Sequence, residues 1–330
     1  MQAEKGASAT GHGPPYPAQM AISGEPVIVP QENAKAAGPS GGTGKLAVAI
    51  AVMAVGTSAI LIMKTQTGPL TTAFYRLLFT TLLVLPWALI YERKALGSLT
   101  PADLLRLAGV GLVLAAHFSL WITSVKLTTV ANSVVLVTTH PLMVAAISAV
   151  FLRESTARTA LFGGVLAGMG VAVMFAGDLG GGGLAGDVLA LGGAVAAGIY
   201  IVAGRSERRK LPTGTYCLVV YGFTTLFLLP LAYGETRLAP AAGMDWGWFL
   251  AMAIVPGILG HTLYNYALGH VPAFVVSTSL LGEPVISSLL AALLFAQYPS
   301  QWALAGIPLI FVGIILAAST SSRQENPPPS

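Results

Sequence analysis

The chain has 330 residues, of which 55% are hydrophobic and only 9% are charged. Soluble domains carry about 25% charged residues, so this composition excludes a disordered chain and argues against a water-soluble enzyme. Cys217 is the only cysteine, which excludes an internal disulfide framework and a zinc site built on cysteine pairs. The formal charge of +4 comes from 17 basic and 13 acidic residues. The positions of these few charges are therefore informative.

The two ends of the chain differ from the rest. Residues 1–44 are rich in Pro, Gly, Ala and polar residues, with no periodic apolar face. Such a segment cannot bury enough apolar surface to offset its ordering entropy, so we predict a disordered tail. It has no basic stretch that leads directly into a short apolar run, and a signal peptide is therefore not expected. Residues 321–330 form a second, shorter tail.

Ten apolar runs lie between the two tails. Each is about 18 to 25 residues long, which is the length that a helix needs to cross ~30 Å of hydrocarbon. The runs lack the alternation of apolar and polar residues that barrel strands show. We therefore predict an all-α polytopic membrane protein with ten transmembrane helices, at residues 46–63, 69–91, 102–124, 128–151, 159–177, 187–204, 215–233, 246–268, 272–296 and 301–319.

The basic residues collect on one side of this topology. With the N-terminus in the cytoplasm, 13 of the 17 Lys and Arg fall in cytoplasmic segments, three fall outside, and Arg76 lies within a span. The positive-inside rule then predicts both termini in the cytoplasm and an even number of spans. The expected location is the plasma membrane. We interpret the basic run Arg205–Lys210 as a cytoplasmic anchor, so no nucleic-acid partner is expected.

The two halves of the chain match each other at an offset of 143 residues. The matched pairs are Pro141 with Pro284, Gly163 with Gly306, Gly170 with Gly313, Trp121 with Tyr264, and His140 with Glu283. Because five spans is an odd number, the second half enters the membrane from the opposite side. The sequence thus predicts inverted five-helix repeats at 45–177 and 187–320, joined by a Gly-rich external linker at 178–186. Inverted repeats are typical of secondary transporters, whose substrate sites lie near the membrane midplane.

Five motifs follow one another in the spans. They are "AFYRLLFTTLL" around Arg76, "HPLMVAAISAVFLRE" from His140, "GEPVISSLLAALLF" around Glu283, and the paired "GGVLAGMGVAVM" and "AGIPLIFVGIILA". In this order and spacing, the chain resembles the drug/metabolite transporter superfamily, specifically its ten-helix EamA-type members. The resemblance implies a transporter, most often an exporter of amino acids or other metabolites. It also implies a structural or gating role for Arg76.

Ionisable residues inside spans are costly to bury and therefore suggest function. Glu283 lies deep in the ninth span, directly before Pro284, which lacks an amide to bond the preceding turn. We expect Glu283 to carry a proton or meet a substrate amine, with pairing to a neighbouring helix as the structural alternative. His140 precedes Pro141, which leaves the Val137 carbonyl unbonded in the same way, and His140 is expected to share the coupling role. A neutral, hydrogen-bonded His140 is the alternative.

The remaining candidate contacts lie mostly on shared helix faces, because residues four apart are neighbours on a helix. Facing aromatic and polar groups would make a largely apolar pocket with few fixed hydrogen bonds. Packing against lipid or other helices is the alternative. The candidates are His117 and Trp121 in the third span, His261, Tyr264 and Asn265 in the eighth, and Asn132 in the fourth. Pro141 and Pro284 are expected to be structural or gating residues, and no catalytic residue, cofactor or metal is expected.

The sequence therefore predicts a secondary active transporter that exports amino acids or related metabolites by alternating access, with proton antiport as its coupling. A facilitative or exchange carrier for another metabolite or drug is an alternative. A membrane-embedded enzyme is disfavoured because the aspartates lie at span ends and no His-Glu-x-x-His motif occurs. A purely structural role stays open. The expected partners are a small-molecule substrate and the lipid bilayer, and the sequence leaves the oligomeric state open.

Cysteine labelling in a Cys217→Ser background tests this topology. Gly182→Cys, in the predicted external linker, should react with an impermeant thiol reagent added outside the cell. Ser206→Cys, in the predicted cytoplasmic loop, should not react, because the reagent cannot cross the bilayer. Reversed labelling of the two variants would contradict the predicted topology.

Overall fold

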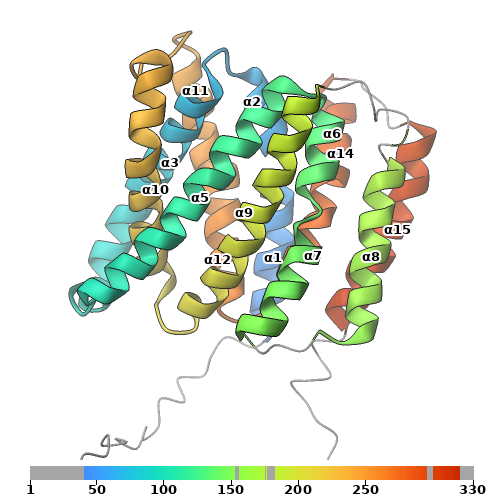
Figure 1. Cartoon of the computed structure of the whole chain (residues 1–330), viewed down its shortest axis with the longest axis horizontal. Helices are drawn as coiled ribbons and strands as arrows, with labels where there is room; N and C mark the ends of the chain where they lie inside the picture. The colour runs from blue at the N-terminus through green and yellow to red at the C-terminus, as the bar shows by residue number, and fades with distance from the viewer. Residues whose placement is uncertain (1–40, 153–155, 175, 177–182, 296–299, 320–330) are drawn as a thin grey trace, which may run out of the picture. The chain divides into compact units, whose positions relative to one another are not determined.

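The computed structural model describes residues 41–152, 156–174, 176, 183–295 and 300–319. These residues form α, π and 3₁₀ helices within one structural unit, and no strand occurs among them (Figure 1). The predicted all-α class is confirmed for this part of the chain. The first helix, α1, begins at Gly41. The predicted tail boundary at residue 44 is therefore wrong by a few residues, and the rest of both tails lies outside the described residues.

Eight helical segments are long and apolar enough to cross a membrane. They are Thr43–Lys64, Pro69–Tyr91, Pro101–Leu127, Asn132–Leu152, Leu184–Arg208, Thr213–Thr236, Asp245–Leu268 and Ala273–Leu290. Two shorter apolar helices, Arg158–Met174 and Leu304–Ala318, accompany them. Each of these segments coincides with one of the ten predicted runs.

Four of the long segments are single α-helices: α3 (Pro69–Tyr91), α5 (Pro101–Leu127), α9 (Leu184–Arg208) and α10 (Thr213–Thr236). Both α3 and α5 begin with proline, whose missing amide costs nothing in a first turn. Thr100 and Asp103 add a capping box at the start of α5. The shorter helices are α8 (Arg158–Met174) and α15 (Gln301–Ser319), and α4 (Arg93–Gly97) is a single turn after α3.

The other four long segments are broken into shorter helices. They consist of α1 (Gly41–Val55) and α2 (Ser58–Lys64); α6 (Val130–Val137), α7 (His140–Ile147) and the π-helix η1 (Ser148–Leu152); α11 (Asp245–Met252), the π-helix η2 (Ala253–Thr262) and α12 (Leu263–Leu268); and α13 (Ala273–Ser279), the 3₁₀ turn η3 (Leu280–Gly282) and α14 (Glu283–Phe295). Pro141 and Pro284 stand in the first turns of α7 and α14. Because proline has no amide to continue the preceding helix, each span restarts there.

The helix contacts follow the offset between the halves. α5 of the third span packs on α9 of the sixth. The repeat mates of these spans are the eighth and the first, and they also pack together, since η2 and α12 contact α1. α3 packs on α10, and α8 lies beside α15 (Figure 1). Each of these last two contacts joins a span to its own repeat mate. The contacts favour the predicted relation between the halves.

Glycines bring α8 and α15 into close contact at two places. A Cβ added to Gly163 would lie 2.6 Å from the carbonyl oxygen of Gly313, and one added to Gly306 would lie 2.4 Å from that of Gly170. The offset of 143 residues exchanges these two contacts. Small residues let helix backbones approach in a membrane, where dispersion replaces the hydrophobic effect between helices.

Two glutamates cap the α3–α10 pair, one at each end. Glu92, just after α3, accepts hydrogen bonds from the amides of Gly214 (3.1 Å) and Thr215 (2.5 Å) at the start of α10. Glu235, in the last turn of α10, accepts one from the amide of Thr71 (2.8 Å) at the start of α3. A carboxylate is stabilised at a helix N-terminus by the unpaired amides and the helix dipole. Glu92 and Glu235 are themselves separated by the repeat offset.

The two capping glutamates lie at opposite ends of the helix bundle. We call the end at which α3, α9 and α12 finish the basic end, because Arg93, Lys94, Arg205 and Arg208–Lys210 gather there. The opposite, distal end is held by hydrogen bonds from Lys126 to the Thr65 carbonyl (2.8 Å) and from the Thr67 amide to Asp245 (2.9 Å).

The α8–α15 contact predicts a sharp difference between two glycines of one helix. Gly170→Ala should destabilise the protein by about 1–3 kcal/mol, because its new methyl group would lie 2.7 Å from the Ile310 amide nitrogen and force a shift. Gly168→Ala is the control, since nothing lies within 4 Å of its added Cβ. Thermal unfolding in detergent should show a lower midpoint for Gly170→Ala alone. Equal midpoints would contradict the tight packing.

Candidate functional site

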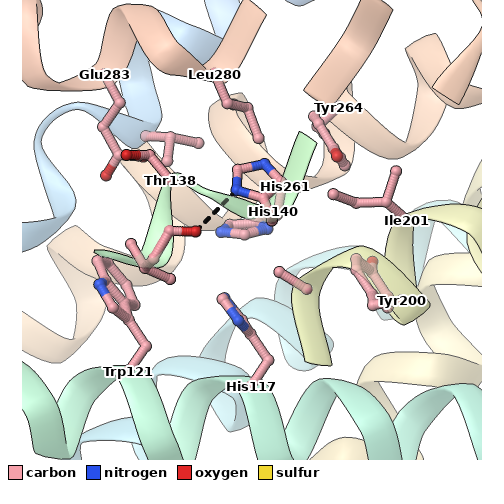
Figure 2. A pocket seen from close by; sticks show the side chains of 13 residues that line it. His117, Trp121, Thr138, His140, Tyr200, Ile201, His261, Tyr264, Leu280 and Glu283 are labelled. Atoms are coloured by element: carbon pink, nitrogen blue, oxygen red, sulfur yellow. Dashed lines mark hydrogen bonds between the residues drawn. The ribbon is translucent and has the colours of Figure 1, made fainter. Parts of the chain in front are cut away.

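A cavity of about 60 Å³ lies among the broken spans (Figure 2). Its polar lining consists of His117, Trp121, Thr138, His140, Tyr200, His261, Tyr264 and Glu283, and its apolar lining of Val55, Val137, Ala197, Ile201 and Leu280. We call it the central cavity. Only α5 and α9 contribute to it as uninterrupted helices.

The helix breaks bring the side chains to the central cavity. Val55 is the last residue of α1, Thr138 follows α6, and Leu280 opens the 3₁₀ turn before Glu283. His261 lies in the π-helix of the eighth span. Discontinuous helices near the midplane are how secondary transporters commonly build substrate sites, because irregular backbone is tolerated where it lines a cavity.

Six of the predicted site residues meet at this cavity: His117, Trp121, His140, His261, Tyr264 and Glu283. Sequence reasoning missed Tyr200 and Thr138. Tyr200 is a tyrosine inside an apolar run, "AAGIYIVAG", but a search for ionisable residues and shared aromatic positions passes over it. Thr138 follows the end of α6, where the predicted helix is interrupted.

Two predicted residues lie outside the cavity lining. Asn132 donates from Nδ2 to Asp187 Oδ1 (3.2 Å) at the distal end. Asn265 is fully buried, accepts a hydrogen bond from the Tyr200 hydroxyl (2.9 Å) and donates one to the Tyr221 hydroxyl (2.9 Å). Asn265 thus supports the cavity wall from behind, because it orients Tyr200.

Two histidines of the cavity are held by backbone carbonyls. His117 Nδ1 lies 2.9 Å from the Gly193 carbonyl oxygen, and the His117 ring stacks on Trp121 with centroids 6.1 Å apart. His140 Nδ1 lies 3.0 Å from the Val137 carbonyl oxygen. The expectation that Pro141 leaves this carbonyl unbonded is therefore wrong, because the His140 ring takes the place of the missing amide. Facing a carbonyl, each Nδ1 carries the proton, and each Nε2 is left as an acceptor.

Three buried polar atoms on the lining have no hydrogen-bond partner among the described residues. They are the Trp121 indole nitrogen, the Tyr264 hydroxyl and His140 Nε2. Buried polar groups are nearly always paired, and leaving one unpaired costs about 1–3 kcal/mol. The indole and the hydroxyl can donate, and the imidazole nitrogen can accept. The lining therefore offers both kinds of hydrogen bond to a polar solute.

One buried acidic and one buried basic side chain lie near one wall of the cavity. Glu283 is 9% exposed on the lining. Arg76 on α3 is 1% exposed, with its Cζ 4.7 Å from the centroid of the Phe118 ring and Nη2 3.5 Å from the Ser58 hydroxyl. Arg76 and Glu283 interact electrostatically. Arg76 is not part of the lining. The Phe118 ring that it faces contacts His261, a lining residue, edge-on, with centroids 5.2 Å apart.

The arrangement suits reversible binding. A carboxylate can hold a proton or an ammonium group, and the aromatic rings can hold an apolar body or a cation. Among the described residues, His, Cys, Asp and Glu side chains form no group of three that could bind a metal ion. Ligand pockets usually measure about 300–1,000 Å³, so this cavity has to widen before it admits a metabolite.

The chain was compared with known protein families and structures. The model of the EamA-like transporter family matches residues 42–176 and again residues 184–319, close to the two predicted repeats. A solved protein crystal structure aligns with 86% of this chain and 99% of its own, with a TM-score of 0.67 and 21% sequence identity. At that identity the likeness shows the fold alone. No curated protein matches the chain.

Proposed function

Since the chain belongs to the EamA-like transporter family, we propose that it is a secondary active transporter that exports amino acids or related small metabolites by alternating access. The central cavity carries this proposal. It combines one carboxylate, three histidines and aromatic rings, and it is lined by segments from both matched halves of the chain.

The proposed protein has ten transmembrane helices in two inverted repeats. The shorter helix Arg158–Met174 has 17 residues, the lower end of the range for a span, and covers about 25 Å at 1.5 Å per residue. One offset of 143 residues relates the two glycine contacts to each other and Glu92 to Glu235. This shared offset supports the repeat. The basic end is proposed to face the cytoplasm of a plasma-membrane protein, because basic residues collect on the cytoplasmic side.

The lining supports a solute with an ammonium group. No Arg or Lys is among the described residues of the lining, which disfavours sugar phosphates and nucleotide sugars as substrates. Glu283 is placed to receive the ammonium group, and Trp121 and Tyr264 are placed to hold an apolar or aromatic body. Their unpaired indole and hydroxyl groups can donate hydrogen bonds to a carboxylate.

Glu283 also supports coupling to protons. Alternating access driven by a proton gradient requires a group that is protonated on one side and deprotonated on the other. Glu283 fits this requirement, with His140 facing the same cavity. A facilitative or exchange carrier is the alternative function, in which Glu283 binds solute without proton exchange. Members of the family are transporters, which argues against an enzyme.

The first functional prediction concerns the aromatic walls. Trp121→Ala and Tyr264→Ala should each reduce amino-acid flux into liposomes several-fold while membrane abundance stays near normal, because each removes a wall of the site. Trp302→Ala is the matched control, since Trp302 is 53% exposed on α15 and away from the cavity. Normal flux in both cavity variants would place the substrate site elsewhere.

The second functional prediction concerns coupling. Glu283→Gln keeps the size of the side chain but fixes it in a neutral form. The variant should lose accumulation driven by a pH gradient and retain part of the solute exchange across the membrane. Flux of labelled amino acids into liposomes, with and without an imposed pH gradient, measures both. Full accumulation with unchanged pH dependence would reject the coupling role, and loss of the folded protein would favour a structural one.

A further inference from the structure

A second and larger cavity opens near the basic end. It measures about 750 Å³ and lies between α5, the end of the fourth span and α9. We call it the basal groove. Its apolar walls include Val110, Val113, Ile147, Leu152 and Val202, and its polar residues are Arg106, Ser206 and Glu207. Phe151 and Ile199, which also line it, are exposed to the surroundings.

The charged edge of the groove is loosely paired. The Glu207 carboxylate lies 3.9 Å from Arg106 Nε and 3.4 Å from Lys210 Nζ. Both distances exceed the ~2.7–2.9 Å of a direct charged hydrogen bond. The side chains of Arg106 and Lys210 are more than half exposed, whereas that of Glu207 is 10% exposed. Ion pairs with exposed partners are weak, so another cation can replace them at Glu207.

The groove and the central cavity share two helices. On α9, Tyr200 and Ile201 line the central cavity, whereas Ile199 and Val202 line the groove. On α5, Val113 lines the groove, and His117, one turn further along, lines the cavity. The two spaces therefore lie on different faces of α9 and about one helical turn apart along α5.

We propose that the basal groove is an entry site, in which a small solute with an ammonium group and an apolar body binds before it reaches the central cavity. This inference rests on the proposed transport function. The ammonium group meets Glu207, and the apolar body lies along Val113 and Ile147. From there, a shift of α9 relative to α5 opens the path to Trp121 and Glu283.

Three properties favour such a solute over a phospholipid as occupant. The buried ionisable group of the groove is the Glu207 carboxylate, which attracts an ammonium group, whereas the basic residue of the lining, Arg106, is exposed at its edge. The volume lies in the range of small-molecule sites, about 300–1,000 Å³. The groove also shares α5 and α9 with a cavity that presents a second carboxylate, Glu283.

A bulky residue at Gly109 tests the groove. Gly109 lines it, and nothing lies within 4 Å of a Cβ added there, so the backbone has room for a side chain, and Gly109→Phe adds bulk to the groove. Gly222→Phe on α10 is the matched control, because its added Cβ is equally free and Gly222 is not part of the groove lining. With a radiolabelled mixture of the twenty amino acids as probe, Gly109→Phe should lower liposome flux several-fold and Gly222→Phe should not.

The charge at the edge of the groove gives a second measurement. Glu207→Gln should raise KM for amino-acid flux several-fold with little change in maximal rate, since it weakens capture and leaves the central cavity intact. Glu207→Asp should retain most of the capture. In a Cys217→Ser background, alkylation of Gly109→Cys by N-ethylmaleimide should be slowed by the same amino-acid mixture.

The outcomes separate the two proposals. Normal flux in Gly109→Phe, with KM unchanged in Glu207→Gln, would overturn the entry site and leave the transport function standing. If Gly109→Phe changed only the amount of copurified phospholipid, the groove would be a lipid site and the inference would also be wrong. A wild-type protein that moves neither amino acids nor related amines would overturn the proposed function, and this inference with it.

Discussion

The need to satisfy every backbone amide and carbonyl in hydrocarbon constrains this structure more than any other interaction. Irregular backbone is tolerated at membrane depth only where it is buried or lines a cavity. The four broken spans contribute most of the lining of the central cavity. Side chains bond the carbonyls freed at the breaks: His140 faces the Val137 carbonyl, and Ser287 donates to the Gly56 carbonyl at 2.6 Å. The site therefore exists because the helices are interrupted there, and its own polar residues stabilise the interruptions.

Length and hydropathy predicted all ten apolar segments, because they measure what a bilayer demands of a helix. The cost of burying polar groups likewise predicted Glu283 and His140. The sequence could not separate Asn265, which bonds Tyr200 and Tyr221 behind the wall, from a lining residue such as Tyr264. Both lie on the same helix, and only the neighbouring helices determine which face meets the cavity. Asn132 is a similar case, since its partner Asp187 is distant in sequence.

The periphery of the molecule follows the repeat more closely than its centre does. Gly163 contacts Gly313 and Gly170 contacts Gly306, two contacts that the repeat offset exchanges. Glu92 and Glu235 cap the same helix pair from opposite ends. At the centre, by contrast, the repeat pairs His140 with Glu283. Equivalent packing allows two halves to exchange roles between conformations, whereas binding a solute requires chemically different groups on facing walls. Like packing outside, and a related pair inside in which His140 stands where the other half has Glu283, fit a carrier built from two related halves.

Arg76 joins these two levels. A buried charge needs compensation, and removing its partner is strongly unfavourable. The compensation of Arg76 comes from the face of Phe118, the hydroxyl of Ser58 and the field of Glu283. Ser58 begins α2, directly after the break in the first span. In the proposed mechanism, a proton or an ammonium group at Glu283 neutralises the charge of that carboxylate. The guanidinium of Arg76 is then stabilised mainly by Ser58 and Phe118. Occupancy of the cavity is thereby linked to the position of a broken helix.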